Sequence, residues 1–411
     1  MEGTQSHTEG KLWFLFALLY LFFDYGRPHD IIPAIGAARP LLLITVMLMA
    51  FVLIRGRFDY FWSPHINVIW LFIILIALHV PFAHNNRYAF RTFKSMLLYM
   101  PFLLSIVFTV TTIKRIRLMM FAGVLLMIAL AVFSILNEGR GPGNYFLDEN
   151  DISLFVNTWL PFCYFLLIAE KSAWKKSIYA VGLIIGLASV VISFSRGGFV
   201  GLIAVAAVVW LFSRRKILAF AGIALLSTVV FYVGDEAYWN EMETVTDTQE
   251  STAQKRLLFW EAGWDMFLDN PLGVGGNNYQ VRIPEYQSPE FRRDMYGVVA
   301  HSLWFTLMPE LGIVGVILFV ILLVFNLRSL FFMLKLTEGV DRCDGIYLQA
   351  LARAFIAGFA GFFASGTFVS VLYYAHYWYL TAFIIAAEEI TFALFGEQQP
   401  GYQLPPLEGA E

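Results

Sequence analysis

Arg196 is the residue whose position in this sequence most strongly suggests chemistry. It interrupts two long apolar blocks within the segment 195–198, which reads Ser-Arg-Gly-Gly, so it must lie where one helix ends and the next begins. An arginine at membrane depth is energetically expensive and is usually functional. Its planar, permanently charged guanidinium suits bidentate contact with phosphate, and the free N–H groups of a helix start also attract anions. Position and residue type together indicate a site for a phosphorylated ligand.

A histidine, His301, stands directly before a later apolar block. With an ordinary pKa near ~6.5, an imidazole can accept a proton from a hydroxyl group close to neutral pH. The alternative interpretation is a polar residue that only marks a helix boundary. The other histidines do not share its position, because His7 lies in the N-terminal tail and the rest border other apolar blocks.

The segment that must bring these side chains together is the polar stretch 235–301, which cannot be a membrane helix. Loops of this length inside a compact fold are usually functional. The capping-box pattern Ser251-Thr252-Ala253-Gln254 predicts a helix through about Leu268, with Arg256 near its start. One face of that helix is apolar and fits either the bilayer surface or the membrane core. This face consists of Leu257, Trp260, Trp264, Phe267 and Leu268.

A glycine-rich turn, Leu272 to Tyr279, follows that helix after Asn270 and Pro271. Its spacing is loosely that of a nucleotide-binding loop, but no strand precedes it and no Lys-Ser/Thr pair follows. A close backbone turn that returns the chain to the membrane explains it better. The segment 235–301 is also net acidic, which disfavours long-range attraction of an anion. A donor that arrives laterally in the bilayer would not need such attraction.

Composition places these elements in a membrane. Hydrophobic residues make up 59% of the chain and charged residues 14%, whereas soluble domains are roughly half apolar and about a quarter charged. The apolar residues form blocks near the ~20 residues that span a hydrocarbon core as a helix, not the alternating pattern of a membrane barrel. We therefore expect an all-α polytopic membrane protein of about twelve transmembrane helices. The expected spans are 11–25, 40–55, 66–83, 92–112, 115–136, 152–170, 175–194, 198–213, 216–234, 302–327, 350–371 and 374–395.

These spans divide the chain into four parts. Residues 1–234 hold the first nine helices, 235–301 form a large periplasmic loop containing the amphipathic helix, 302–395 hold the last three helices, and 396–411 form a cytoplasmic tail. The first apolar block reads as a retained helix, because charged residues stand where a signal peptide would have its small-residue cleavage site.

The distribution of basic residues predicts the orientation. Lysines and arginines concentrate in alternate short loops, which places both termini in the cytoplasm and the 235–301 loop in the periplasm. Every short-loop base on the outer side except Lys94 is an arginine, which fits phosphate contact or snorkelling to lipid headgroups. Cys163 falls in a span and Cys343 in a cytoplasmic loop, so we expect no disulfide between them.

Three stretches of the sequence, taken together, have a specific order, a specific spacing and the same expected side of the membrane. They are Ser193-Phe194-Ser195-Arg196-Gly197-Gly198; Arg256 with Trp260, leading into Asp269-Asn270-Pro271-Leu272-Gly273-Val274-Gly275; and Ala300-His301-Ser302-Leu303, followed by Pro309-Glu310-Leu311-Gly312-Ile313-Val314-Gly315. Together they resemble the O-antigen ligase family of bacterial membrane proteins, which also includes related polysaccharide polymerases. The resemblance covers roughly residues 180–330, and the remainder is similar only in hydropathy.

The resemblance implies a GT-C-like, twelve-helix, inverting glycosyltransferase of the bacterial inner membrane that needs no metal or other cofactor. Such enzymes move a glycan from undecaprenyl pyrophosphate to an acceptor hydroxyl in the periplasm. His301 matches the proposed general base, and Arg196 and Arg256 match the arginines thought to hold the pyrophosphate. A further basic residue from an earlier outer loop is implied, and Arg91, Arg87 and Lys94 are its candidates. Ser302 stands where the family usually has asparagine.

The implied chemistry agrees with the residues themselves. Glycosyl transfer from a pyrophosphate needs preorganised cations for the leaving group and a base for the acceptor hydroxyl. The sequence has no Asp-x-Asp on the expected outer side and no paired His/Cys spacing for a metal. The expected partners are the lipid-linked glycan donor, a lipid A core or second glycan acceptor, and membrane lipid, with no nucleic acid.

Two alternatives stay open at the level of sequence. A polymerase would use the same donor and differ from a ligase only in its acceptor. A polysaccharide lipid transporter or flippase would also suit twelve helices, but such proteins usually carry internal repeats and binding sites at the membrane midplane. No repeat between the two halves is visible here, and the conspicuous polar groups gather at the outer rim instead.

Overall fold

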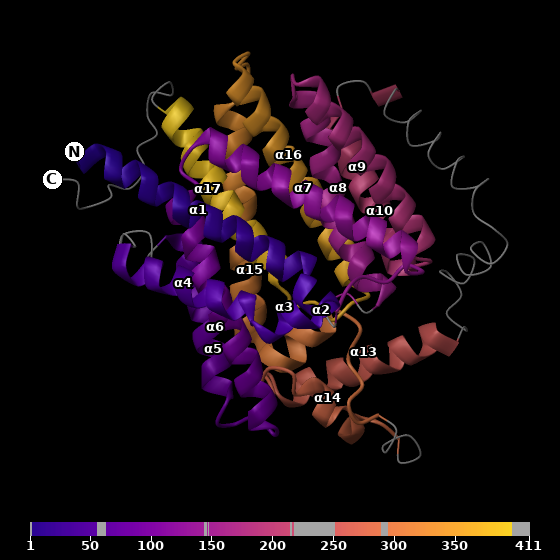
Figure 1. Ribbon diagram of the computed structural model, residues 1–411. Helices are drawn as coiled ribbons and strands as arrows, with labels where there is room; N and C mark the ends of the chain where they lie inside the picture. Colours follow the sequence, from indigo (N-terminus) through magenta and orange to yellow (C-terminus); the bar gives the residue numbers. More distant parts are fainter. Residues whose placement is uncertain are drawn as a thin grey trace.

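The computed structural model describes residues 2–55, 63–143, 146, 148–213, 216–217, 251–288 and 295–396 (Figure 1). Within these ranges every regular element is a helix, and no strand occurs among them. The all-α prediction is therefore confirmed for the described part of the chain. The ninth predicted span, 216–234, falls almost entirely outside the described residues, as does the segment 218–250.

Seven of the described helices are long and apolar enough to cross a membrane. They are α6 (Asn86–Thr109), α7 (Ile113–Leu136), α8 (Glu149–Ala169), α9 (Ala173–Ile192), α15 (Trp304–Leu336), α16 (Cys343–Gly366) and α17 (Ala375–Phe395). Three shorter apolar helices accompany them: α4 (Pro40–Arg55), α5 (Pro64–His79) and α10 (Arg196–Phe212). Each predicted span that lies among the described residues is a helix, and the total of twelve stays a prediction.

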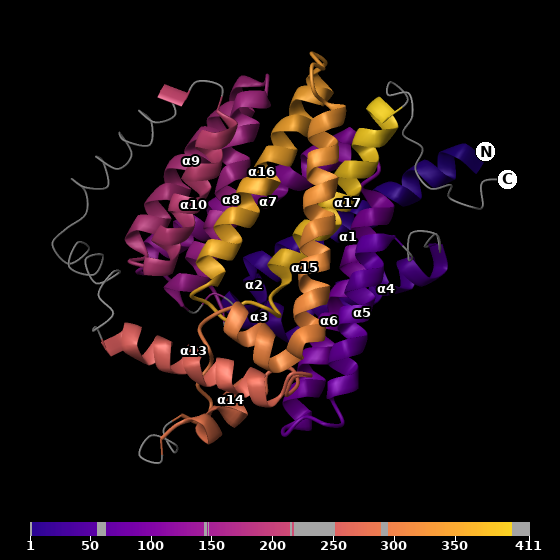
Figure 2. The ribbon, with the colours of Figure 1, turned by 180° about the vertical axis from the view of Figure 1, so that it is seen from behind.

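The remaining described helices are α1 (Glu2–Gly26), α2 (Pro28–Ile31), α3 (Pro33–Ala37), α13 (Ser251–Asp269), α14 (Tyr279–Arg282) and a 3-10 turn, η2 (Ile283–Tyr286). The predicted helix through Leu268 is thus confirmed as α13, which ends one residue later. Figure 2 shows α13 and α14 lying across one end of the bundle, and the opposite view in Figure 1 agrees. This end contains the motifs identified from the sequence.

Close helix approach holds the centre of the bundle together. α16 packs along α8 and α10, and a Cβ built on Gly361 of α16 would lie 2.6 Å from the carbonyl oxygen of Asn157 in α8. The Asn157 side-chain amide donates to the carbonyl of Gly198 in α10 at 2.7 Å and to the Ser365 hydroxyl at 3.1 Å. Without a hydrophobic driving force between helices in lipid, small residues and interhelical hydrogen bonds supply the contact.

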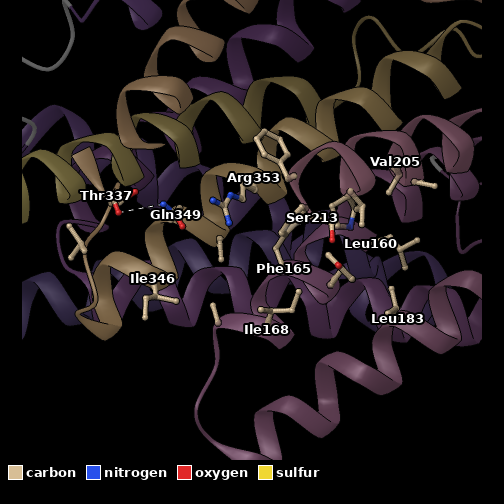
Figure 3. A pocket seen from close by; sticks show the side chains of 18 of the residues that line it. Leu160, Phe165, Ile168, Leu183, Val205, Ser213, Thr337, Ile346, Gln349 and Arg353 are labelled. Carbon is tan, nitrogen blue, oxygen red and sulfur yellow. Dashed lines mark hydrogen bonds between the residues drawn. The ribbon is translucent and has the colours of Figure 1, made fainter. Parts of the chain in front are cut away.

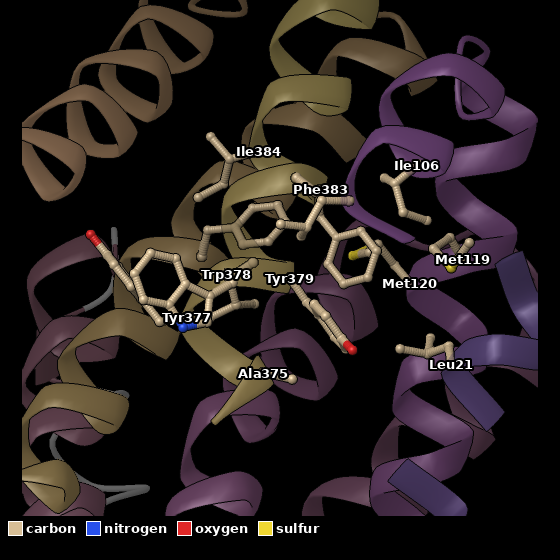
Figure 4. Packing of buried hydrophobic residues seen from close by; sticks show 14 of the residues in the cluster. Leu21, Ile106, Met119, Met120, Ala375, Tyr377, Trp378, Tyr379, Phe383 and Ile384 are labelled. Atoms are coloured by element: carbon tan, nitrogen blue, oxygen red, sulfur yellow. The ribbon is translucent and has the colours of Figure 1, made fainter. Parts of the chain in front are cut away.

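Aromatic side chains of α17 fill the other half of the core. The ring of Tyr379 lies edge-on to that of Phe102 of α6, with 4.5 Å between the ring centroids. The ring centroid of Phe319 of α15 lies 4.7 Å from that of Tyr377. Figure 4 shows that Tyr377, Trp378 and Tyr379 leave α17 in different directions, so one helix reaches several neighbours. α17 is buried nearly all round, as a helix that is apolar on every face should be.

Candidate active site

The glycine-rich turn after α13 docks onto a break in α15. Gly312 interrupts α15 with φ 64° and ψ −167°, which frees backbone groups inside the helix. The N–H groups of Val274 and Gly275 donate to the carbonyls of Pro309 and Glu310 at 2.9 and 2.8 Å, and the N–H of Ile313 donates to Pro271 at 2.9 Å. The turn and the broken helix therefore satisfy each other's polar groups. The predicted close backbone turn is confirmed.

Glycine is required on both sides of this contact. A Cβ on Gly273, whose φ is +98°, would lie 2.6 Å from the carbonyl oxygen of Glu310. Gly312 has a positive φ as well, and its Cβ would meet the Pro271 carbonyl. Two stretches that the sequence places nearly forty residues apart are thus built for backbone contact without side chains between them.

The carboxylate of Glu310 anchors the rest of the turn. Glu310 is 2% exposed and accepts hydrogen bonds from the N–H groups of Asn277 at 2.7 Å and Tyr279 at 3.1 Å. The Tyr373 hydroxyl donates to it at 2.7 Å. A buried carboxylate with three donors is well satisfied. Glu310, whose role the sequence left open, therefore fixes the loop that forms one wall of the site.

A cavity of about 320 Å³ lies between this loop, α8, α15 and the connection before α17. It contains His301, and its other lining residues are Asp148, Asp151, Asn277, Tyr279, Gln280, Val299, Ala300, Thr306, Glu310, Val369, Ser370, Tyr373 and Tyr374. Hydroxyls, amides and carboxylates surround it, as a polar or hydroxylated ligand requires. The cavity is lined by residues that precede the 235–301 loop in the sequence, by residues within it and by residues that follow it.

His301 is held in an unusual backbone conformation at the wall of this cavity. Its φ is 46°, in the left-handed region that few non-glycine residues adopt. Trp260 fixes the preceding residue, because its indole N–H donates to the Ala300 carbonyl at 3.1 Å while its ring stacks on Phe305 with 5.3 Å between centroids. Strain of this kind persists only where the surroundings impose it. The fold therefore sets the direction of the imidazole.

The surroundings of His301 favour the neutral form of its imidazole. Partial burial lowers the pKa of His301, and the Arg256 guanidinium lowers it further, while Asp148 acts in the opposite direction. The structure thus brings Arg256 and Asp148 within electrostatic reach of His301. A histidine whose pKa lies below its ordinary value is unprotonated at neutral pH and can accept a proton.

Arg196 occupies the first position of α10, as the sequence predicted. The Ser195 hydroxyl caps this helix by accepting from the Gly198 N–H at 2.8 Å, and it donates to the Asn150 amide oxygen at 2.7 Å. The Asn150 amide in turn donates to Asp148 at 2.6 Å. The turn that carries Arg196 is therefore connected to the His301 cavity through three hydrogen-bonded residues.

The turn that carries Arg196 is also connected to α13, in this case through apolar contacts. A Cβ on Gly197 would lie 3.0 Å from Cβ of Phe368, and the Phe368 ring lies 6.1 Å from that of Trp260. Arg196 and Arg256 do not themselves line the cavity around His301. The structure brings the three motifs together at one end of the bundle, and the roles of the three side chains stay predictions.

The earlier basic candidates stand apart from this cavity. Arg87, Arg91 and Lys94 are exposed on the first turns of α6 and do not line it. Thr92 on the same helix accepts from the Asn277 side-chain amide at 2.7 Å, and Asn277 is a lining residue. α6 is therefore adjacent to the site, and the three basic side chains lie on the outer face of the same stretch.

The apolar stripe predicted on α13 is divided. Trp260 packs inward as described, but Leu257, Trp264 and Leu268 are about half exposed. The buried face of α13 is formed instead by Phe259, Ala262 and Met266, which pack with Val274, Tyr279 and Ile283. Hydrophobic periodicity could not separate a face that packs on the protein from an adjacent face that is open to the surroundings.

The residues around His301 include several that the sequence analysis did not select. Asp148 and Asp151 begin α8, and Tyr373 and Tyr374 precede α17. Their only sequence signal is a polar or hydroxylated residue at the end of an apolar block, a feature shared by many helix ends. No group of three metal-ligating side chains occurs among the described residues, and the expectation of a metal-independent reaction stays a prediction.

Comparison with known protein families identifies the segment that carries these motifs. Residues 181–320 match the family model of O-antigen ligase. This chain carries an O-antigen ligase family domain. The match begins in α9, before the Arg196 turn, and ends in α15, after the Gly312 break, so it includes Arg256 and His301 as well. No curated protein matches the chain.

The family and the helices agree on the class of protein. The described part of the chain is a multi-pass, all-α membrane protein, and its segment 181–320 is of the O-antigen ligase and polymerase type, a family that in general acts on lipid-linked glycans. The O-antigen ligase segment contains the three motif stretches on which the resemblance is based, and the segments directly before α8 and α17, outside it, supply Asp148 and Tyr373 to the wall of the cavity.

Proposed function

We propose that this protein is a metal-independent inverting glycosyltransferase that moves a glycan from undecaprenyl pyrophosphate to an acceptor hydroxyl at the periplasmic face of the bacterial inner membrane. The observation that carries the proposal is His301: a half-buried imidazole, kept neutral beside Arg256, on the wall of a polar cavity within the O-antigen ligase segment. The acceptor is a lipid A core in the ligase reaction.

In the proposed reaction His301 takes the proton from the acceptor hydroxyl as that oxygen attacks the anomeric carbon of the donor sugar. The bond from this carbon to the pyrophosphate oxygen breaks, and undecaprenyl pyrophosphate leaves with the bonding electrons. Arg196 and Arg256 stabilise the negative charge of the leaving group, with a further contribution from Arg91, Arg87 or Lys94. Fixed cations outside bulk water are effective because they need no reorganisation during the reaction.

The low pKa of His301 fits this role. A base must be unprotonated before the reaction, and proximity to a guanidinium that binds the donor favours the neutral imidazole. When the donor pyrophosphate occupies the guanidinium, its negative charge raises the proton affinity of the imidazole at the moment the proton is transferred. The same arginine therefore serves both steps in the proposal.

A direct test is the His301→Asn variant. Asparagine tolerates the left-handed backbone conformation better than alanine does, so the wall of the cavity should keep its shape. We expect turnover to fall by about a hundredfold to ten-thousandfold, the usual contribution of a general base. Release of undecaprenyl pyrophosphate from purified lipid-linked glycan is the measurement. Unchanged turnover would remove His301 from the mechanism.

The same assay separates the alternatives. A transferase releases undecaprenyl pyrophosphate, whereas a transporter or flippase moves the lipid-linked glycan without changing its covalent structure. A polymerase uses the same donor as a ligase, so the assay is run with either a lipid A core or a second lipid-linked repeat unit as acceptor. The acceptor that supports product formation assigns the activity.

A further inference from the structure

A second, larger cavity extends along the side of the bundle from the end away from His301. Its volume is about 920 Å³, near the upper end of the roughly 300–1,000 Å³ typical of small-molecule sites. α16 fixes its location. The Gly366 carbonyl at one end of α16 accepts from the N–H of Leu303, close to the candidate active site, whereas Ile346, Gln349 and Arg353, in the first turns of α16, line the cavity.

The walls of this cavity are mostly apolar, and among the described residues it is open to the side of the bundle. α8, α9 and α10 contribute side chains such as Leu160, Leu183 and Val205, which lie together at one end of the cavity in Figure 3, away from Thr337 and Gln349. Ile168 and Ile346 at its margin are 64% and 39% exposed. Exposed apolar side chains on a membrane-spanning bundle face hydrocarbon, so an acyl chain of the bilayer can enter without crossing water.

One guanidinium lies inside these walls. Arg353 is about ten residues from the start of α16, and therefore about 15 Å along the helix axis from the Cys343 end. Figure 3 shows its nitrogen atoms between Gln349 and Phe165, and its guanidinium carbon lies 5.8 Å from the ring centroid of Phe212. A charge at this depth is costly and usually marks a functional site. A planar guanidinium suits a phosphate in particular.

The other charged lining residue among those described is a carboxylate nearer the end of the bundle. Asp341 is exposed and precedes α16 by two residues. Gln349 donates its side-chain amide to the Thr337 carbonyl at 3.4 Å, which connects the first turns of α16 to the same rim. From the rim inward the cavity thus presents an anion and then a cation. A lipid headgroup whose ammonium lies nearer the rim than its phosphate would place each of its charges beside the opposite charge of the cavity.

We propose that this cavity binds a phospholipid of the surrounding bilayer whose headgroup is phosphoethanolamine, with the phosphate on Arg353, the ammonium at Asp341 and an acyl chain between α8, α9 and α10. The bound lipid fills a gap in the wall of the bundle and stabilises α16, whose other end adjoins the His301 cavity. This site is separate from the proposed transferase site and does not depend on its chemistry.

The test uses the full-length protein exchanged into vesicles of equal phosphatidylethanolamine and phosphatidylglycerol, then extracted in mild detergent and analysed by native mass spectrometry. We expect the wild type to retain phosphatidylethanolamine in preference to phosphatidylglycerol. Arg353→Gln should lower the retained lipid by about tenfold or more, as expected for the loss of a charge-assisted hydrogen bond. Lys335→Gln, which removes an exposed charge on α15 outside the cavity, is the matched control and should retain lipid as the wild type does.

Two further variants separate the headgroup from the chain. Asp341→Asn should abolish the preference for phosphatidylethanolamine while lipid is still retained. Ala206→Trp, which places a large side chain in the cavity from α10, should displace lipid without changing charge, and it provides the test if Arg353→Gln fails to fold. Wild-type-like retention by Arg353→Gln or by Ala206→Trp would overturn the proposal. An unchanged preference in Asp341→Asn would overturn the assignment of the headgroup.

Discussion

At the scale of single residues, the site depends on how the surroundings of His301 set its proton affinity. Partial burial and Arg256 lower the pKa of His301, and Asp148 opposes them. Asp148 also accepts from the Asn150 N–H at 2.7 Å at the start of α8. One carboxylate therefore has two functions, a helix cap and a counter-charge for the imidazole. Only the second should appear in the pH dependence of turnover.

The pH profile of the transferase tests this arrangement. Because the pKa of His301 is lowered, the base is neutral throughout the neutral range, and activity should fall only when the pH drops below the ordinary histidine pKa of ~6.5. Asp148→Asn removes the influence that raises the pKa, so the acidic limb of kcat/KM should move to lower pH. A limb that stays in place or moves to higher pH would contradict the assignment of this limb to His301.

A control for the Asp148 variant is Glu285→Gln. Glu285 accepts from Arg282 at 2.8 Å at the surface near η2 and does not line the cavity. Its loss changes the net charge of the protein by the same amount as Asp148→Asn, but in the 235–301 segment and away from the cavity. The acidic limb should therefore be unchanged in Glu285→Gln, which separates a local effect on the imidazole from a general change of charge.

At the scale of elements, the deciding feature is the contact between the glycine-rich turn and the broken α15. Without this contact, the turn would leave the N–H groups of Val274 and Gly275 unpaired, and α15 would leave the carbonyls of Pro309 and Glu310 unpaired. A polar backbone group without a partner inside a membrane protein costs several kcal/mol, an order-of-magnitude value. The two motifs therefore fold together, and Glu310 adds the side-chain part of the same contact.

Gly312→Ala should destabilise the protein through this contact. A Cβ there would be placed at a positive φ and would also collide with the backbone of Pro271 and Leu272. Gly339→Ala is the matched variant, because Gly339 has φ +72° but open space around it, so that only the backbone cost of roughly 1–3 kcal/mol applies. Thermal unfolding in detergent should show a clearly larger loss for Gly312→Ala. Equal losses would mean that the docking contact contributes little.

At the scale of the whole molecule, the candidate active site lies at one end of the bundle, and the cavity proposed to bind a phospholipid extends from the other. α16 spans the distance between them, from Cys343 to Gly366. The predicted orientation places the His301 end in the periplasm and the Arg353 end toward the cytoplasm. The exposed Leu257, Trp264 and Leu268 of α13 would then face the outer surface of the bilayer.

Cysteine labelling tests this orientation with residues that the chain already has. Cys343 is exposed at the start of α16, whereas Cys163 is buried and should not react. A membrane-impermeant maleimide should therefore label intact spheroplasts only weakly and label fully after permeabilisation. Ser288→Cys in a Cys343→Ser background places an exposed thiol in the long loop, and it should react in intact spheroplasts. The reverse pattern would invert the orientation.

The sequence by itself determined the class of protein and the position of its family motifs. Spans of apolar residues are read directly because lipid requires every backbone group to be paired within a helix, and the spans that fall among the described residues are helices accordingly. The sequence predicts Arg196 at a helix start and a close backbone turn after α13, because Ser-Arg-Gly-Gly and the glycine run are local signals. The docking of that turn onto α15 came from the structure.

Only the tertiary structure decided which residues surround His301. Asp148 and Tyr373 come from segments far from it in the chain, and no local pattern distinguishes them from ordinary helix ends. The same holds for the face of α13, where Phe259 and not Leu257 is buried. A hydrophobic pattern reports that a side chain avoids water, but in a membrane protein lipid and protein satisfy that requirement equally, so only packing separates them.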